Sequence, residues 1–231
     1  MRGVFGSVGL ALLQDGEGHR GRLLVGMASA LVEKGYSATT IADVARQARV
    51  SKRTFYEHFA DKQECFIACY EGASEIAIKS ILNALSPQMP WDDRVRVATE
   101  TYLSMLESNP ALTRTLMMDI YAAGPRALKV RRDVQRRFAS VFRELVDRGR
   151  AEYPGLKRLS PEMAAAVIGG VNELVLLAVE EGRTHRLTEL AGTANALMQA
   201  VLRSLFDERS RARDTRPPPH SRPSSKLRRS R

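Results

Sequence analysis

The residues that suggest a specific chemistry stand next to one another at Ser51, Lys52, Arg53 and Thr54. In the first turn of a helix, they would present hydroxyls, cations and free backbone N–H groups together. This combination suits an anionic phosphate chain, and an arginine also suits the acceptor edge of guanine. The four residues therefore predict contact with nucleic acid, with Arg53 as the base-reading side chain.

Further side chains extend this predicted surface. Phe55 and Phe59 have the spacing of the buried side of the same helix, which places Tyr56 and His58 on the side that can reach phosphates. Phosphate contact is also natural at the starts of neighbouring helices and at the turn between them. The residues predicted to make it there are Thr40, Arg49 and Lys62.

Each of these residues also has a plain structural explanation. Thr40 and Ser51 can act as helix caps alone. His58 can serve only in packing, and Lys52 can be solvated without a partner. The pattern favours nucleic-acid contact for the segment as a whole more than for any one side chain.

The elements that must position these side chains are two short helices. Thr40 can cap the first of them, with Asp43 completing a capping box, and the helix ends near Ala48. A short turn through Arg49 follows, and Ser51 caps the second helix. Two short helices joined by three or four residues have the dimensions of a helix-turn-helix.

The surrounding block, RLLVGMASALVEKGYSATTIADVARQARVSKRTFYEHFADKQECF at residues 22–66, resembles the N-terminal domain of TetR/AcrR-type regulators. The shared features are an opening arginine with two apolar residues, a Gly-Tyr after the first helix, a Thr-Thr-apolar cap, a Val-Ser turn and TFYEHF followed by a lysine. The resemblance implies that the matching positions contact phosphates or read bases. Those positions are Thr40, Ser51, Lys52, Arg53, Thr54, Tyr56, His58 and Lys62.

Two positions depart from the family pattern. The family usually has glycine where Arg49 stands, at a turn that favours a left-handed backbone, and often where Arg53 stands. An arginine in that conformation costs about 1 kcal/mol, which a fold can absorb. The departure therefore concerns the geometry of the turn, and Arg49 could add a phosphate contact.

The rest of the chain predicts an all-α fold, because apolar residues recur at helical spacing and no segment alternates like a strand. Together with the resemblance, this implies a three-helix DNA-binding domain followed by a larger helical ligand-binding and dimerisation domain. The other predicted helices cover residues 20–34, 62–85, 92–106, 109–122, 125–149, 163–179 and 187–206.

The predicted organisation has four parts. Residues 1–18 form a disordered arm, 19–62 the helix-turn-helix domain, 63–207 the effector and dimer domain, and 208–231 a disordered basic tail. Gly3 to Gln14 could mimic a signal peptide, but three glycines and the missing cleavage site favour an arm or an early start codon.

The net charge of +10 is concentrated near the ends of the chain. Residues 209–231 hold nine basic residues and one acid, a net of +8, and residues 20–62 hold eight basic residues and four acids. The remainder sums to −2. The tail keeps an alternative function open, a non-specific nucleic-acid packaging protein.

The last two helices are predicted to form a homodimer interface, as the resemblance implies. Residues 163–179 are apolar nearly all round, with Gly169 and Gly170 permitting close approach. Ordinary core is the alternative explanation. A symmetric dimer would require a palindromic double-stranded DNA operator. The predicted interface residues are Val167, Ile168, Gly170, Val171, Leu174, Leu190, Ala194, Leu197 and Val201.

A ligand pocket among the central helices is implied by the resemblance alone. Most of its candidate residues would equally suit a plain core. Because few of them are charged, they favour an apolar or amphipathic small-molecule effector. The candidates are Tyr70, Tyr102, Met105, Met117, Tyr121, Phe138, Phe142 and Glu173.

Several function classes are disfavoured. Cys65 and Cys69, four apart on a predicted helix, have poor disulfide geometry and indicate a reduced, cytoplasmic protein. The four histidines lack metal-ligand spacing, and no nucleophile or phosphate-loop motif indicates an enzyme or a cofactor. No uncharged stretch approaches about 20 residues, which predicts no membrane span.

Overall fold

The computed structural model describes residues 18–86 and 88–206, so the predicted basic tail and nearly all of the predicted arm lie outside the described residues. The described part contains helices and no strand, which confirms the all-α prediction. The elements are α2 (His19–Ala38), α3 (Ile41–Ala48), α4 (Lys52–His58), α5 (Lys62–Ala84), α6 (Trp91–Glu107), α7 (Pro110–Ala122), α8 (Pro125–Glu152), α9 (Pro161–Glu180), the 3-10 helix η1 (Thr184–Leu190) and α10 (Ala191–Ser204).

The residues at several helix ends fix where those helices begin and end. Gly35 interrupts α2 with φ 72°, a left-handed value that favours glycine. Thr40 and Asp43 form the predicted capping box at the start of α3. The Asn109 side chain accepts a hydrogen bond from the Leu112 N–H, and Pro110 occupies the first position of α7.

The C-terminal helix differs from the prediction. Instead of one helix over 187–206, the chain forms η1 and then α10, with Arg186 in a non-helical conformation (φ −139°). Leu187 is fully buried in a cluster with Leu103 of α6 and Val175 of α9. Tertiary packing of this leucine therefore overrides the helical period of the segment.

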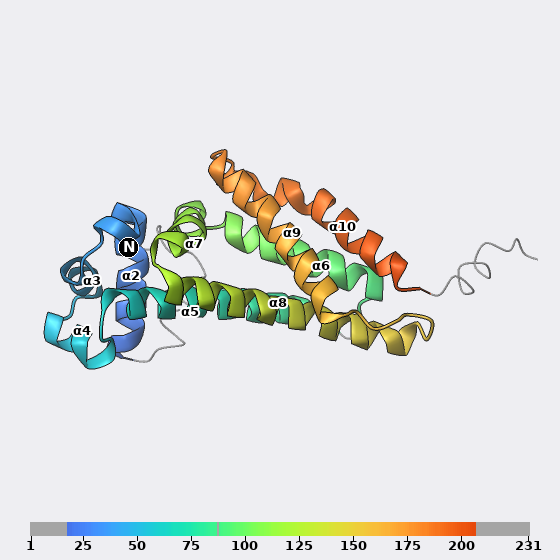
Figure 1. Ribbon diagram of the computed structural model, residues 1–231, viewed down its shortest axis with the longest axis horizontal. Helices are drawn as coiled ribbons and strands as arrows, with labels where there is room; N and C mark the ends of the chain where they lie inside the picture. Colours follow the sequence, from blue (N-terminus) through green and yellow to red (C-terminus); the bar gives the residue numbers. More distant parts are fainter. Residues whose placement is uncertain (1–17, 87, 207–231) are drawn as a thin grey trace, which may run out of the picture.

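Helices α2, α3 and α4 form one end of the molecule, and α5 and α8 run lengthwise away from it (Figure 1). Helices α9 and α10 lie together over the other half. One apolar core joins α2–α4 to the first half of α5 and to α7, with Phe55, Phe66 and Leu116 among its buried members. The helix-turn-helix helices therefore share one continuous core with the helices that follow them.

The two cysteines are part of that core. Cys65 and Cys69 are both free and buried. Burial raises the pKa of Cys65 and raises the pKa of Cys69 to about 12. Neither thiol is therefore poised as a reactive thiolate.

Helix α9 is long and apolar enough to cross a membrane by length and composition, which the sequence analysis did not anticipate. Core helices of globular proteins pass the same test. Here, however, only 33% of its most apolar window is buried within the chain. Much of this helix therefore presents apolar surface that the single chain leaves uncovered.

Candidate nucleic-acid interface and internal cavity

Helix α4 packs against the protein core on one side and is exposed to solvent on the other. Phe55 is fully buried, and its ring centroid lies 5.8 Å from that of Phe59. The Ser51 hydroxyl accepts a hydrogen bond from the Thr54 N–H at 3.0 Å, so the predicted cap is present. Because the apolar side points into the core, Lys52, Arg53, Tyr56 and His58 are exposed.

The turn before α4 has the predicted geometry. Arg49 has φ 54° and ψ 47°, and it is the sole non-glycine residue with positive φ in the described chain. Its N–H donates to the Arg46 carbonyl at 3.2 Å. The left-handed turn therefore forms with arginine where the resembled family usually has glycine.

An ion pair lies on the exposed side of α4. Arg53 Nε is 3.3 Å from a carboxylate oxygen of Glu57, and the two side chains are 91% and 54% exposed. Glu57 was not among the predicted site residues, although its i,i+4 spacing from Arg53 is a recognisable signal. This carboxylate holds Arg53 along the helix and will repel any phosphate that approaches it closely.

Two predicted phosphate contacts are engaged inside the protein. The Lys62 ammonium donates to the Tyr36 carbonyl at 2.8 Å and lies 4.3 Å from the centre of its ring. Lys62 is therefore bound to α2 in this structure, and its contact with a phosphate stays a prediction. Thr40 caps α3, and Lys34 and Thr40 hold the pKa of Asp43 well below its usual range through hydrogen bonds.

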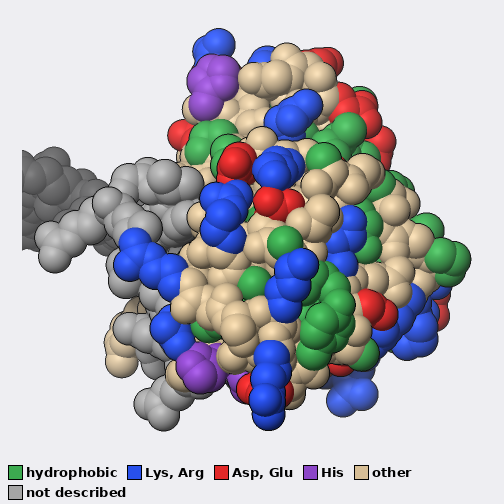
Figure 2. Space-filling model, turned by 90° about the vertical axis from the view of Figure 1, so that its left-hand side faces the viewer, with side chains coloured by type: hydrophobic (Ala, Val, Ile, Leu, Met, Phe, Trp, Pro, Cys, Tyr) green, Lys and Arg blue, Asp and Glu red, His purple; other side chains and the backbone are tan. Residues whose placement is uncertain are grey.

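The end of the molecule formed by α2–α4 shows several Lys and Arg side chains spread over its surface (Figure 2). Arg20, Arg22, Lys52 and Arg53 are exposed residues of this end. Such a surface attracts a polyanion at long range, and its strength depends on salt.

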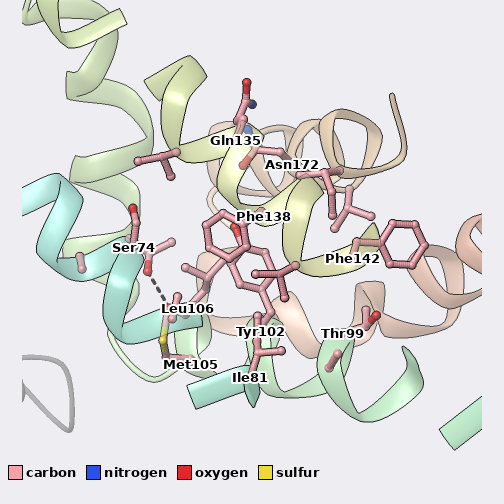
Figure 3. A pocket seen from close by; sticks show the side chains of 18 of the residues that line it. Ser74, Ile81, Thr99, Tyr102, Met105, Leu106, Gln135, Phe138, Phe142 and Asn172 are labelled. Carbon is pink, nitrogen blue, oxygen red and sulfur yellow. Dashed lines mark hydrogen bonds between the residues drawn. The ribbon is translucent and has the colours of Figure 1, made fainter. Parts of the chain in front are cut away.

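An internal cavity of about 130 Å³ lies among the helices of the second half. In its middle, the rings of Tyr102 and Phe138 pack with centroids 5.4 Å apart (Figure 3). No charged side chain lines it in the described structure. Six of the predicted pocket residues line it, namely Tyr70, Tyr102, Met105, Met117, Phe138 and Phe142.

Two predicted pocket residues lie elsewhere. Tyr121 is 46% exposed and stacks under Arg131, and Glu173 is exposed on α9. Both stand on helices that line the cavity but on another face, which periodicity alone did not resolve. The polar lining residues that the sequence analysis missed carry no distinctive motif. They are Ser74, Thr99, Asn109, Thr113, Gln135 and Asn172.

Helix α7 connects the cavity to the α2–α4 end. Its residues Leu112, Leu116 and Met117 line the cavity. Two residues further on, an Asp119 carboxylate oxygen accepts a hydrogen bond from the Tyr36 N–H at 2.6 Å. A displacement of α7 would therefore pull directly on the end of α2.

Only some of the predicted interface residues of α9 and α10 lie on the exposed apolar face of these helices. Val167, Val171 and Ala194 were predicted interface residues but are buried in the chain's own core. Leu177 and Leu197 are 45% and 37% exposed. Helices α9 and α10 thus carry apolar residues on more than one side. One side packs inside the chain, and the other is exposed.

Residues 24–69 match the family described as bacterial regulatory proteins, tetR family. The N-terminal domain belongs to the TetR family. This match contains the cap of α3, the turn at Arg49 and the whole of α4. The fold of the chain is that of TetR-type regulators, with an N-terminal helix-turn-helix domain and a helical second domain.

Curated relatives are similar over part of their length. The HTH-type transcriptional activator FasR of Mycolicibacterium smegmatis is 27% identical over 106 residues, which cover 46% of this chain and 48% of FasR. The nucleoid occlusion factor SlmA of Vibrio campbellii is 26% identical over 148 residues, which cover 62% of this chain and 76% of SlmA. The chain thus spans about half of FasR.

Solved structures share the fold. The fatty acid degradation regulator FadR of Bacillus halodurans superposes with a TM-score of 0.70 at 15% identity, covering 81% of this chain and 98% of that one. FadR of Bacillus subtilis, in complex with stearoyl-CoA, has a TM-score of 0.66 at 15% identity, with 76% and 95% covered.

Proposed function

We propose that the chain is a homodimeric transcriptional regulator that binds a palindromic DNA operator and releases it when a small molecule enters the cavity. The observation that carries this proposal is α7, which lines the cavity and also binds the end of α2 through Asp119. The proposed output is repression, which is typical of the TetR family. The relatives are regulators, which supports a cytoplasmic, non-enzymatic role.

The proposed DNA contacts follow from the exposed face of α4. Arg53 reads a base, since an arginine can bind the O6 and N7 atoms of guanine with two hydrogen bonds. Lys52, Tyr56 and His58 contact phosphates, which fix the helix in the major groove without reading sequence. Arg49, Ser51 and Thr54 lie beside them and complete the contact surface.

The proposed dimer uses the exposed face of α9 and α10. Met163 and Leu177 are large exposed apolar residues of α9, and Leu197 lies exposed on α10. Between them, a side chain added at Gly169 would meet nothing within 4 Å in the chain itself. Helices with small residues can approach closely, so this face suits the same face of a second copy.

The proposed response to an effector is a shift of α7. The chain shares its fold with a FadR that was solved with stearoyl-CoA, which supports a ligand in the corresponding half of the molecule. A ligand that enlarges the cavity displaces Leu112 and Leu116, and Asp119 passes the movement to Tyr36. Release requires only that the ligand binds the displaced state more tightly.

Selection from a pool of random DNA duplexes tests the regulator. The full chain is expected to enrich one palindrome at near-physiological salt, and ultracentrifugation is expected to show two chains on each duplex. Binding without enrichment would contradict the proposal and support the packaging alternative. Deletion of residues 209–231 separates the two functions, because a regulator keeps sequence-specific binding without the basic tail.

A further inference from the structure

The cavity is elongated. Its lining residues on α5 extend from Tyr70 to Ile81, and those on α8 extend from Val134 to Leu145. Eleven residues of helix rise about 16 Å. Arg137 of α8 binds Glu75 of α5, so the two helices run side by side along this length. A chain-like molecule fits such a shape better than a round one.

The two ends of the cavity differ in polarity. The end far from the DNA-binding domain is mainly apolar, with Ile81, Val95, Leu145 and Met198 in its lining. The hydroxyl of Thr99 at this end donates to the Val95 carbonyl at 2.9 Å. The near end contains the Tyr70 phenol and the Gln135 amide. Because Tyr70 lines this end of the cavity, its hydroxyl can donate a hydrogen bond to a ligand there.

One cation stands beside the polar end. Arg131 donates a hydrogen bond to the Gln135 side-chain oxygen at 3.4 Å and lies 5.1 Å from the centre of the Tyr121 ring. Within the described residues, these contacts of Arg131 are with an amide and an aromatic ring and not with a carboxylate. Tyr70, which lines this end of the cavity, is itself only partly buried, so this end lies close to the surface of the molecule.

We infer that the cavity binds an amphipathic molecule with one long apolar chain and an anionic head group. The head lies at Arg131 and Tyr70, and the chain runs along α5 and α8 toward Ile81 and Leu145. This inference rests on the proposed role of the cavity as the effector site. Free fatty acids and their coenzyme A thioesters share the required chemistry.

The distribution of charge decides this orientation. A charge inside the cavity would lose its hydration without a counter-charge, whereas an anion at Arg131 stays near water and gains a charged hydrogen bond. Burial raises the pKa of Tyr70 to about 12, despite the opposing effect of Arg131, so its hydroxyl stays protonated and can donate to the head group.

The size of the cavity links binding to movement. An apolar cavity of about 150 Å³ accepts a molecule the size of benzene. The present volume of about 130 Å³ is therefore too small for a chain of a dozen carbons. Such a ligand must part the surrounding helices, α7 among them, and the gain from burying its chain drives this movement.

Calorimetric titration of the full-length protein without DNA tests the inference. Dodecanoate and dodecanoyl-CoA are expected to bind, and methyl dodecanoate is expected to bind at least ten-fold more weakly because it lacks the anion. Tighter binding of the thioester or of the free acid would identify the natural source of the chain. Equal binding of all three would overturn the role of the head group.

Variants locate the two ends of the ligand. Arg131→Gln is expected to weaken dodecanoate binding roughly ten-fold to a hundred-fold, as the loss of a charged hydrogen bond does. Arg132→Gln removes the next, exposed cation of α8 and serves as the matched control. Ala98→Phe narrows the apolar end and is expected to weaken binding of dodecanoate but not of hexanoate.

Two results would overturn the assignment: unchanged dodecanoate binding in Arg131→Gln, or unchanged dodecanoate binding in a folded Ala98→Phe variant. Failure of the proposed function gives a different result. If dodecanoate binds and the protein still holds its operator, regulation by the cavity fails while the ligand assignment stands. If another molecule releases the operator and no amphipath binds, the ligand assignment fails alone.

Discussion

The exposed face of α4, which carries the proposed base-reading Arg53, and the cavity of the second domain differ in where their polar groups lie. On α4, seven consecutive residues are anchored by Phe55 and Phe59, and their charged side chains stand in water. In the cavity, side chains from several helices converge, and none of those that line it is charged. The first arrangement suits a polyanion outside the protein, and the second suits an apolar molecule inside it. Helix α7 connects the two regions, because it lines the cavity and is also hydrogen-bonded to α2 through Asp119.

The largest expected effect comes from preventing the proposed dimer, so that the two α4 helices can no longer bind one operator together. Gly169→Leu places a large side chain on the exposed face of α9, where the chain itself has room and leucine favours the helix. Loss of bivalent binding is expected to reduce operator affinity by roughly 10²-fold or more. Ultracentrifugation and operator titration measure it. Ser140→Leu on exposed α8 is the control, and a dimeric Gly169→Leu protein would refute this interface.

A second substitution tests whether α4 reads sequence. Arg53→Ala is expected to cost about 1–3 kcal/mol at one operator position and to relax the base preference there. Lys52→Ala is the matched control, because loss of a phosphate contact weakens binding to all duplexes alike and lowers the dependence on salt. Competition titrations against single-base operator variants measure both. Equal losses on every duplex for both variants would remove Arg53 from the base-reading role.

A third substitution separates the reading face from the cavity. Asp119→Asn weakens the acceptor that holds the Tyr36 N–H, so an α7 displacement is transmitted less effectively to α2. Effector binding is expected to stay unchanged, while its effect on operator affinity falls by roughly 1 kcal/mol or more. Titrations of effector and operator, separately and together, measure the coupling. Undiminished coupling would show that the movement follows another route.

The smallest expected effect concerns the carboxylate on α4. Glu57→Gln removes a negative charge from the proposed DNA-contacting face of α4 and frees Arg53 from its ion pair. Affinity for random duplexes is expected to rise a few-fold, and discrimination between operators to fall slightly, since such an exposed pair is worth about 0.2–1 kcal/mol. Filter binding at several salt concentrations measures both changes. Reduced affinity for random DNA would contradict this role of Glu57.

The sequence alone determined the local geometry of the DNA-binding domain. The capping box at Thr40, the left-handed turn at Arg49 and the cap at Ser51 depend on a residue and its neighbours within three or four positions. The buried pair of phenylalanines follows from helical period. Such short-range interactions can be read from the printed order of the residues.

Only the tertiary structure decided which side of each apolar helix is covered. The sequence pattern predicted one apolar helix that contains both Val171 and Leu177. In the structure, α8 and α10 bury Val171, whereas Leu177 is exposed. The Lys62 ammonium turned inward because the Tyr36 carbonyl and ring lie within its reach. The cavity has no sequence motif, since its lining comes from six helices. Contacts between segments that are distant in the sequence decide these features. A helical period predicts that a helix has an apolar face, but it does not predict which element packs against that face.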